Sequence, residues 1–297
     1  MRALGPWLLI ALLFATQSVA AGLERKSFRQ DGLRRSYLEY VPDAPAPASG
    51  RPLVLVLHGG GGTARGIARE AGSGFHAFAE ATGAVIVYPD AVGRMWDFGE
   101  DAASEALSPR RDDLAYFQGV IARVLAERGG DSARVFATGI SRGGQASYFL
   151  ACKLPGRIRA IAPVAMPLPE FLEDDCRAAP GVPIAVINGT ADPIVPYDGG
   201  PITVRRGTRG EVLSTDATLA LFRARNGCGG GSEASRIGQV VRREWRGCRR
   251  PTVLYRVQGG GHTWPSGSQY LPRRMIGPVN RDIDGAAEIA AFFARFL

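Results

Sequence analysis

The feature that most constrains the fold is an uninterrupted apolar run, residues 52–57, that ends directly in His58 and four glycines. Such a run is typical of a strand buried on both faces, as in a parallel sheet. Further strand candidates are residues 36–41, 84–88, 134–138, 158–164, 184–187 and 253–257. The helix candidates lie between or after these strands and are residues 66–82, 112–128, 144–154 and 285–296. Asp112 and Asp113 are well placed for the N-terminus of the second of these helices. Alternating strands and helices predict an α/β fold with a mostly parallel, doubly wound sheet and helices on both faces.

The chain length of 297 residues allows one or two domains of this kind. The composition is that of an ordinary globular protein, with 45% hydrophobic and 22% charged residues. No linker, internal repeat or long low-complexity tract divides the chain after its N-terminus. We therefore expect a single domain over residues 21–297.

The N-terminus has the pattern of a secretory signal peptide. Arg2 is followed by an apolar run, residues 7–15, and small residues then offer a cleavage site after Ala20. The run is shorter than the ~20 residues that a membrane-spanning helix needs. We expect residues 1–20 to be removed and the mature chain to be secreted, periplasmic or extracellular, without stable membrane insertion. The alternative is an uncleaved membrane anchor.

The four cysteines fit export. Four cysteines can pair in three ways, and none of them forms a C-x-x-C motif. With only three histidines present, this spacing argues against a zinc site. We expect two disulfides in sequential pairing, Cys152 with Cys176 and Cys228 with Cys248. The alternative is four buried thiols.

The charge is strongly basic, with a net charge of +8 and a calculated pI of about 9.7. Residues 242–250 hold the densest group of arginines. Such a group can attract an acidic polysaccharide or an anionic cell surface by long-range steering. The simpler interpretation is a solvated face of a basic protein. No nucleic-acid-binding motif accompanies the charge, so we expect no nucleic-acid partner.

The first motif that carries chemistry is Gly139-Ile-Ser141-Arg-Gly143, which matches G-x-S-x-G. This pattern needs a sharp turn from strand to helix, in which small neighbours allow the serine to stand above the sheet edge. Here it follows a strand candidate and precedes a helix candidate, as the motif requires. We therefore predict Ser141 as a nucleophile. The alternative is a serine that caps an ordinary helix.

A nucleophilic serine needs a base, and the only histidines are His58, His76 and His262. His76 lies within a helix candidate, and His58 lies at the end of the first buried strand. In the α/β-hydrolase chain order the serine comes first, then the acid, then the histidine. Only His262 follows Ser141, so His262 is the predicted general base.

The acid that orients this histidine must lie between the two. Asp192 follows the strand candidate 184–187 and is the predicted acid, and Asp198 is the second candidate. Asp282 and Asp284 follow the histidine and resemble capping residues of the last helix.

Acyl transfer also needs hydrogen-bond donors for the oxyanion. Backbone amides after the nucleophile and in a glycine loop after an early strand serve this purpose. The pattern points to Arg142 and Gly60, with Gly59 or Gly61 possible at an offset of one. The alternative is a glycine-rich surface turn.

Together these strings resemble the secreted polyhydroxybutyrate depolymerase and feruloyl esterase-like α/β-hydrolases. The resemblance covers essentially the whole mature chain and rests on six strings, which are His58-Gly-Gly-Gly-Gly, Asp112-Asp113, Gly139-Ile-Ser-Arg-Gly-Gly144, Gly189-Thr-Ala-Asp192-Pro-Ile-Val-Pro-Tyr197, Gly260-Gly-His262-Thr-Trp264-Pro265 and Arg281-Asp-Ile-Asp-Gly-Ala. It implies Ser141, Asp192 and His262 as a catalytic triad and supports the sequential cysteine pairing.

The chain departs from the family pattern at three places. Asn188 stands where relatives often have histidine, and Ser266 separates Pro265 from Gly267 in the usual Trp-Pro-Gly. The chain ends at Leu297, directly after the last helix candidate, so we expect a bare catalytic domain without a polymer-binding module.

These observations predict a serine esterase that hydrolyses feruloyl or acetyl esters of plant polysaccharide, or related small esters. Trp96 and Trp264 are candidates for the wall of an acyl pocket, unless they only pack in the core. Residues 199–216 and 265–281 are long connections that we expect to shape or cover the cleft. Their arginines are candidates to meet a substrate carboxylate, namely Arg205, Arg206, Arg273 and Arg274.

Three other functions remain open at this point. A short-chain polyhydroxyalkanoate depolymerase would use the same residues, and so would a peptidase, although nothing in the sequence favours amides. A protein of another class, a non-catalytic carbohydrate-binding protein on a hydrolase fold, would lack a residue of the triad or of the G-x-S-x-G motif. Here all of these residues are present. The mechanism needs no cofactor, and we find no metal or nucleotide motif.

Overall fold

A computed structural model describes residues 22–99, 102–105, 107, 110–204 and 207–297. The expected signal peptide, residues 1–20, and the candidates Arg205 and Arg206 lie outside the described residues. Within the described residues, no helix is both long and apolar enough to span a lipid bilayer.

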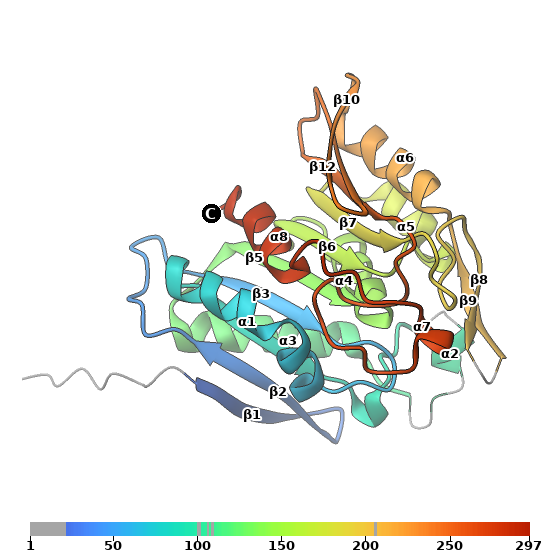
Figure 1. The fold of residues 1–297 in the computed structure, drawn as a ribbon. Helices are drawn as coiled ribbons and strands as arrows, with labels where there is room; N and C mark the ends of the chain where they lie inside the picture. The colour runs from blue at the N-terminus through green and yellow to red at the C-terminus, as the bar shows by residue number, and fades with distance from the viewer. Residues whose placement is uncertain (1–21, 100–101, 106, 108–109, 205–206) are drawn as a thin grey trace, which may run out of the picture.

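The fold is built on a ten-stranded sheet with the strand order β1-β2-β4-β3-β5-β6-β7-β12-β11-β10 (Figure 1). The six strands from β4 to β12 in this order are parallel to one another. The strands of this sheet are β1 Gly22–Gln30, β2 Leu33–Val41, β3 Arg51–Leu57, β4 Val85–Asp90, β5 Gly130–Ile140, β6 Ala160–Val164, β7 Ile184–Gly189, β10 Ser232–Ile237, β11 Val240–Trp245 and β12 Thr252–Val257. The predicted α/β fold with a mostly parallel sheet is confirmed.

Helices cover both faces of the sheet and create two hydrophobic cores. On one face α1 (Ala64–Thr82) and α8 (Gly285–Ala294) pack together, and their apolar residues share one core with the sheet. On the other face a second core includes residues of α3 (Asp113–Arg128), α4 (Arg142–Lys153), α5 (Glu173–Ala178) and α6 (Thr215–Asn226). The remaining helical segments are short, namely η1 Val92–Arg94, α2 Ala102–Glu105, η2 Glu170–Leu172 and α7 Arg273–Ile276.

The two aspartates at the start of α3 have different roles. Asp112 caps the helix, because its carboxylate accepts a 2.8 Å hydrogen bond from the Ala115 amide. Asp113 is fully buried and forms an ion pair with the equally buried Arg35 of β2. Burial raises the pKa of Asp113, and Arg35 opposes that shift by favouring the carboxylate. Asp113 therefore ties α3 to β2 in addition to starting the helix.

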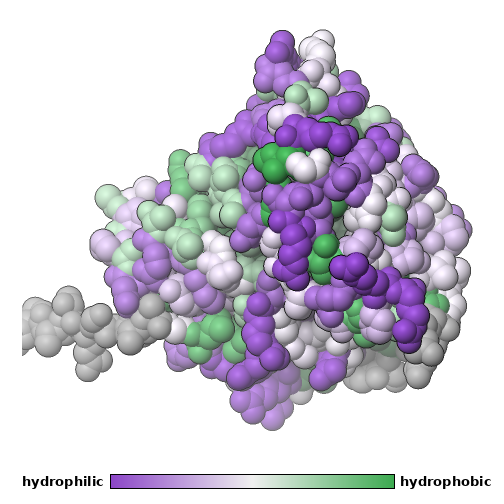
Figure 2. Space-filling view, viewed as in Figure 1, coloured by the Kyte–Doolittle hydropathy of each residue, from purple (hydrophilic) through white to green (hydrophobic). Residues whose placement is uncertain are grey.

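The outer strands of the sheet were not predicted from the sequence. β1 pairs with β2, and β10 and β11 extend the sheet beyond β12, all antiparallel. Every residue of β10 is exposed, so this strand lacks the apolar pattern that identifies a buried strand. On the face of the molecule seen in Figure 2, hydrophilic residues predominate and hydrophobic ones form small separate patches.

The two long connections lie together at one side of the sheet in Figure 1. Residues 199–216 contain a β-hairpin, β8 (Gly200–Val204) and β9 (Gly207–Val212), that the sequence did not predict. Residues 265–281, named here the covering segment, contain α7 and run between the end of β12 and α8.

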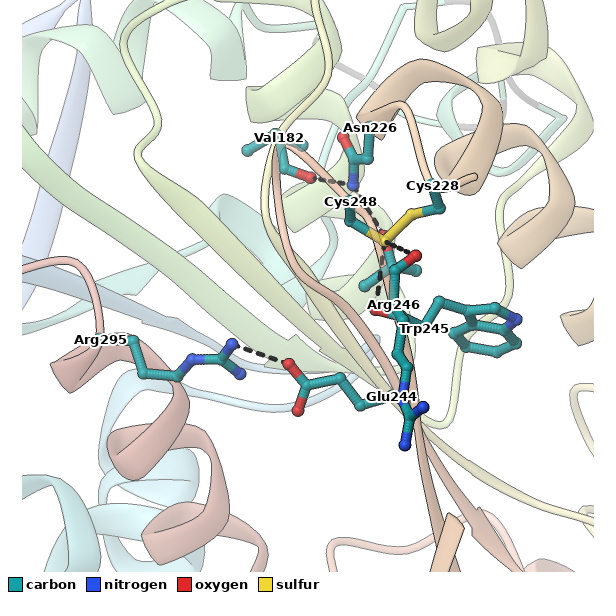
Figure 3. Close-up of a disulfide and its surroundings, with 9 residues drawn as sticks. Val182, Asn226, Cys228, Glu244, Trp245, Arg246, Cys248 and Arg295 are labelled. Carbon is teal, nitrogen blue, oxygen red and sulfur yellow. Dashed lines mark hydrogen bonds and ion pairs between the residues drawn. A yellow bond between two sulfur atoms is a disulfide. The ribbon is translucent and has the colours of Figure 1, made fainter. Parts of the chain in front are cut away.

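The cysteines are joined in the expected pairs. The Cys152–Cys176 bond of 1.98 Å links α4 to α5, and the Cys228–Cys248 bond of 2.00 Å links the end of α6 to the loop between β11 and β12 (Figure 3). Part of the basic cluster 242–250 is neutralised beside the second disulfide. Glu244 forms ion pairs with Arg242 and Arg295, and Arg246 forms one with Glu233.

Replacing both Cys228 and Cys248 with serine should lower the free energy of unfolding by about 3 kcal/mol, the entropic value for a closed loop of this size. The bond restricts the unfolded chain, because its two cysteines are 20 residues apart in sequence. Urea unfolding followed by circular dichroism measures the change, with the Cys152 and Cys176 double serine variant as a comparison. An unchanged midpoint and slope for the first variant would contradict the expectation.

Candidate active site

Ser141 lies at the sharp turn between β5 and α4, and two glycines permit this turn. A Cβ atom at Gly143 would lie 2.1 Å from the Leu57 carbonyl oxygen, and one at Gly139 would lie 2.5 Å from the same atom. Any side chain at either position would therefore collide with the backbone of β3. Ser141 itself has φ 57° and ψ −123°, an uncommon conformation for a residue other than glycine. The G-x-S-x-G pattern thus forms the strand-to-helix turn that the sequence predicted.

Asp192 and His262 are brought together by the loops that follow β7 and β12. The Asp192 Oδ2 atom lies 2.7 Å from His262 Nδ1, and the two side chains are 2% and 4% exposed. The second carboxylate oxygen of Asp192 accepts hydrogen bonds from the Ile194 and Val195 amides, at 2.8 and 2.9 Å. The carboxylate is thus fixed on both oxygens, and it sets the orientation of the imidazole.

Gly189 allows these two loops to approach each other. A Cβ atom at Gly189 would lie 2.3 Å from the Gly260 carbonyl oxygen, so the loop that carries Asp192 packs directly on the backbone before His262. The second acid candidate, Asp198, is exposed, and no described hydrogen bond joins it to His262. Asp284 caps α8 as expected, since its carboxylate accepts from the Ala286 and Ala287 amides.

The other two histidines have structural contacts. His58 Nε2 accepts a 3.1 Å hydrogen bond from the Ala91 amide, and its Nδ1 lies 2.8 Å from the Gly59 carbonyl oxygen, which together require the neutral ring protonated at Nδ1. Burial lowers the pKa of His58 and keeps this form. His76 stacks on Tyr40, with ring centroids 3.9 Å apart, and its Nε2 is bonded to the Tyr88 hydroxyl.

Ser141 and His262 line one cavity of about 920 Å³. Its walls come from the glycine loop after β3, from α1, from the start of α4, from the β8–β9 hairpin and from the covering segment. The lining residues are His58, Gly59, Gly60, Gly61, Gly62, Thr63, Gly66, Ile67, Arg69, Glu70, Met95, Ile140, Ser141, Arg142, Gln145, Met166, Ile194, Ile202, Val204, Arg209, His262, Ser268, Tyr270, Leu271 and Ile276.

The backbone of the glycine loop distinguishes the candidate oxyanion donors. The Gly61 amide donates to the Arg94 carbonyl oxygen at 2.8 Å, and the Gly62 amide donates to the Gly59 carbonyl oxygen at 3.0 Å. For the Gly60 and Gly59 amides no such backbone acceptor is found among the described residues, so Gly61 is the candidate that this geometry disfavours. Arg142 is the first residue of α4, and its guanidinium is bonded to the Trp96 carbonyl oxygen. The Arg142 side chain thus fixes neighbouring structure and does not point to the oxyanion role predicted for its amide.

The interpretation of Trp96 and Trp264 as walls of an acyl pocket is wrong for the cavity that the described residues form. The two side chains are 0% and 1% exposed, and neither lines the cavity. Trp96 stacks on His58 and donates a 2.9 Å hydrogen bond to its carbonyl oxygen. Trp264 packs edge-on against Phe75 of α1. Both rings fill the core beside the site.

The two long connections contribute to the cavity as expected, through Ile202, Val204, Arg209 and several residues of the covering segment. Arg273 and Arg274 of α7 are not among the lining residues. Among the described residues, the lining arginines outside α4 are Arg69 of α1 and Arg209 of β9. No sequence motif marks the contributions of Arg69, Glu70 and Tyr270, because they depend on contacts between distant parts of the chain.

The comparisons with known proteins agree with this architecture. No protein-family model matches the chain. It is 31% identical over 278 residues to the protein named "Putative esterase NocK" of Nocardia uniformis subsp. tsuyamanensis, covering 86% of this chain and 78% of that protein. It is 29% identical over 243 residues to feruloyl esterase C of Emericella nidulans, covering 78% of each chain.

A solved structure, acetyl xylan esterase from Aspergillus awamori, matches the fold with a TM-score of 0.61 over 91% of this chain and 99% of that chain. At 14% identity this match bears on the fold alone. The resemblance to feruloyl esterase-like proteins is confirmed by the sequence relatives. The chain belongs to the α/β-hydrolase family of esterases and is a carboxylic ester hydrolase.

Proposed function

We propose that this protein is a secreted serine esterase that hydrolyses feruloyl or related esters of plant polysaccharide through Ser141, His262 and Asp192. The observation that carries the proposal is the joint placement of these residues. Ser141 stands on a strained turn in the wall of the cavity, and His262, bonded to Asp192 at 2.7 Å, lines the same cavity.

In the proposed mechanism His262 Nε2 takes the proton of the Ser141 hydroxyl as its oxygen attacks the ester carbonyl carbon. Asp192 holds the ring so that Nδ1 carries its proton and Nε2 is free to accept one. The amides of Gly60 and Arg142 donate to the oxyanion of the tetrahedral intermediate. His262 then protonates the leaving alcohol, and water hydrolyses the acyl-enzyme by the same steps.

The walls of the cavity favour a large acyl group. Eight apolar side chains from six separate parts of the chain line the cavity away from Ser141, namely Ile67, Met95, Met166, Ile194, Ile202, Val204, Leu271 and Ile276. A cavity of about 920 Å³ far exceeds the needs of an acetyl group and accommodates a substituted aromatic acid. The name of the fungal relative, feruloyl esterase C, points to the same acyl group. Secretion is supported by the N-terminal pattern and by the two disulfides.

We expect methyl ferulate to be hydrolysed with a kcat/KM at least ~10-fold above that of methyl acetate, because burying an aromatic group of this size contributes about 1.5–3 kcal/mol. The two esters release the same alcohol, so their initial rates compare the acyl groups alone. Clearing of a polyhydroxybutyrate suspension without ferulate hydrolysis would favour the depolymerase alternative. Hydrolysis of the acetate alone would leave the esterase mechanism and refute the feruloyl assignment.

A further inference from the structure

The covering segment holds both peptide groups of His262. The His262 amide donates a 2.6 Å hydrogen bond to the Ile276 carbonyl oxygen. On the other side, the Tyr270 hydroxyl donates a 2.8 Å hydrogen bond to the His262 carbonyl oxygen. Together with the Asp192 contact at Nδ1, these bonds restrain the backbone and the ring of His262 from three directions.

Hydrogen bonds within the covering segment stabilise its conformation. The Gln269 side chain donates to the carbonyl oxygens of Leu271 and Gly277, at 2.8 and 3.0 Å, and accepts from the Val279 amide. The loop that carries Tyr270 is therefore closed by its own polar contacts.

The segment is also fastened to α1, almost two hundred residues earlier in the chain. The Glu70 carboxylate accepts hydrogen bonds from the amide of Ser268, at 2.9 Å, and from its hydroxyl. A Cβ atom at Gly267 would lie 2.2 Å from Glu70 Oε1, so the backbone passes directly against this carboxylate. Glu70 thus fixes the point from which Tyr270 reaches His262.

The surroundings of the Tyr270 hydroxyl favour its protonated form, which is the form that donates to the His262 carbonyl oxygen. Tyr270 is 47% exposed as a whole, but the loss of water around its hydroxyl raises the pKa of that group, and the nearby carboxylates of Asp192 and Glu70 act in the same direction. The raised pKa favours the protonated, donating hydroxyl, and Tyr270 also lines the cavity.

We propose that Tyr270 is a positioning residue for the general base. Its hydroxyl holds the His262 peptide so that the ring presents Nε2 to Ser141, and Glu70 holds the segment that carries Tyr270. The inference rests on the proposed function of His262 and adds the two residues, Tyr270 and Glu70, that orient its ring.

Tyr270→Phe tests this role, because it removes only the hydroxyl. We expect kcat for methyl ferulate to fall about 10-fold, since small displacements of a reacting group are costly, while KM changes by less than about twofold. The matched control is Tyr40→Phe, which removes a hydroxyl bonded to Glu80 at 2.6 Å on the outer side of α1. Its kinetic constants should equal those of the wild type.

A second readout does not depend on turnover. The proton between His262 Nδ1 and Asp192 should give a low-field resonance in the ¹H NMR spectrum of the wild type, and Tyr270→Phe should broaden it through faster exchange with water. A raised KM at unchanged kcat, or an unaltered rate and resonance, would overturn the proposal.

A pair of substitutions at Glu70 separates positioning from loss of fold. Glu70→Ala removes the acceptor for Ser268 and should lower kcat as Tyr270→Phe does, whereas Glu70→Gln keeps an oxygen acceptor and should restore most of that loss. Equal losses in the two Glu70 variants would contradict the role of this contact. If the wild type shows the low-field resonance but hydrolyses no ester, the proposed function fails while the positioning of His262 stands.

Discussion

Ser141→Ala should lower kcat for ester hydrolysis by about 10⁴-fold or more, the loss typical of removing one member of a catalytic triad. The substitution keeps the Cβ atom, so the strained turn at φ 57° is no more strained than before. The cavity, the His262–Asp192 contact and the glycine loop all remain, and only the attacking oxygen is lost. Initial rates with methyl ferulate, measured at equal protein concentration, give the change.

Ser147→Ala is the matched control for this variant. Ser147 lies six residues after Ser141, within α4, is fully buried, and donates a 3.1 Å hydrogen bond to the Gly143 carbonyl oxygen. Its loss should cost about 1 kcal/mol of stability and leave the rate of hydrolysis intact. Equal rates for Ser141→Ala and the wild type would mean that another residue is the nucleophile.

The sharp turn at Ser141 was predictable from the sequence because its physical causes are local. Gly139 and Gly143 are needed where the turn approaches the Leu57 carbonyl oxygen, and both positions lie within two residues of Ser141. The contact between Asp192 and His262 spans 70 residues, yet chain order and the ends of two parallel strands were enough to predict it. Here the fold class itself places the residues, since parallel strands end at one edge of the sheet.

The rest of the site depends on packing that no local pattern records. The contact between Glu70 and Ser268 joins residues 198 positions apart, through an α1 side chain whose neighbours in sequence give no sign of it. Trp96 and Trp264 were placed wrongly, because an aromatic residue after a buried strand fits a core or a cleft equally well. The stacking of Trp96 on His58 and the contact of Trp264 with Phe75 show that both side chains belong to the core. The edge strand β10 escaped prediction since both of its faces are exposed.

Asp192→Asn should have the second largest effect, a fall in kcat of about 10⁴-fold, as expected when the base of a triad is held in the wrong tautomer. The carboxylate oxygen Oδ1 accepts from the Ile194 and Val195 amides, and an asparagine would keep its carbonyl oxygen there. Its NH₂ group would then face His262 Nδ1 in place of Oδ2. A donor at that position forces Nδ1 to accept and moves the ring proton to Nε2, where it blocks acceptance of the Ser141 proton.

Asp198→Asn is a matched test of this reasoning, because it makes the same chemical change six residues later at an exposed carboxylate. It should leave kcat and KM at wild-type values, while Asp192→Asn loses kcat with little change in the free energy of unfolding. The reverse result, a large loss for Asp198→Asn and a small one for Asp192→Asn, would show that the loop after β7 rearranges before catalysis. A large loss in both would mean that the two carboxylates act on His262 together, and the role of the single 2.7 Å contact would then have to be abandoned.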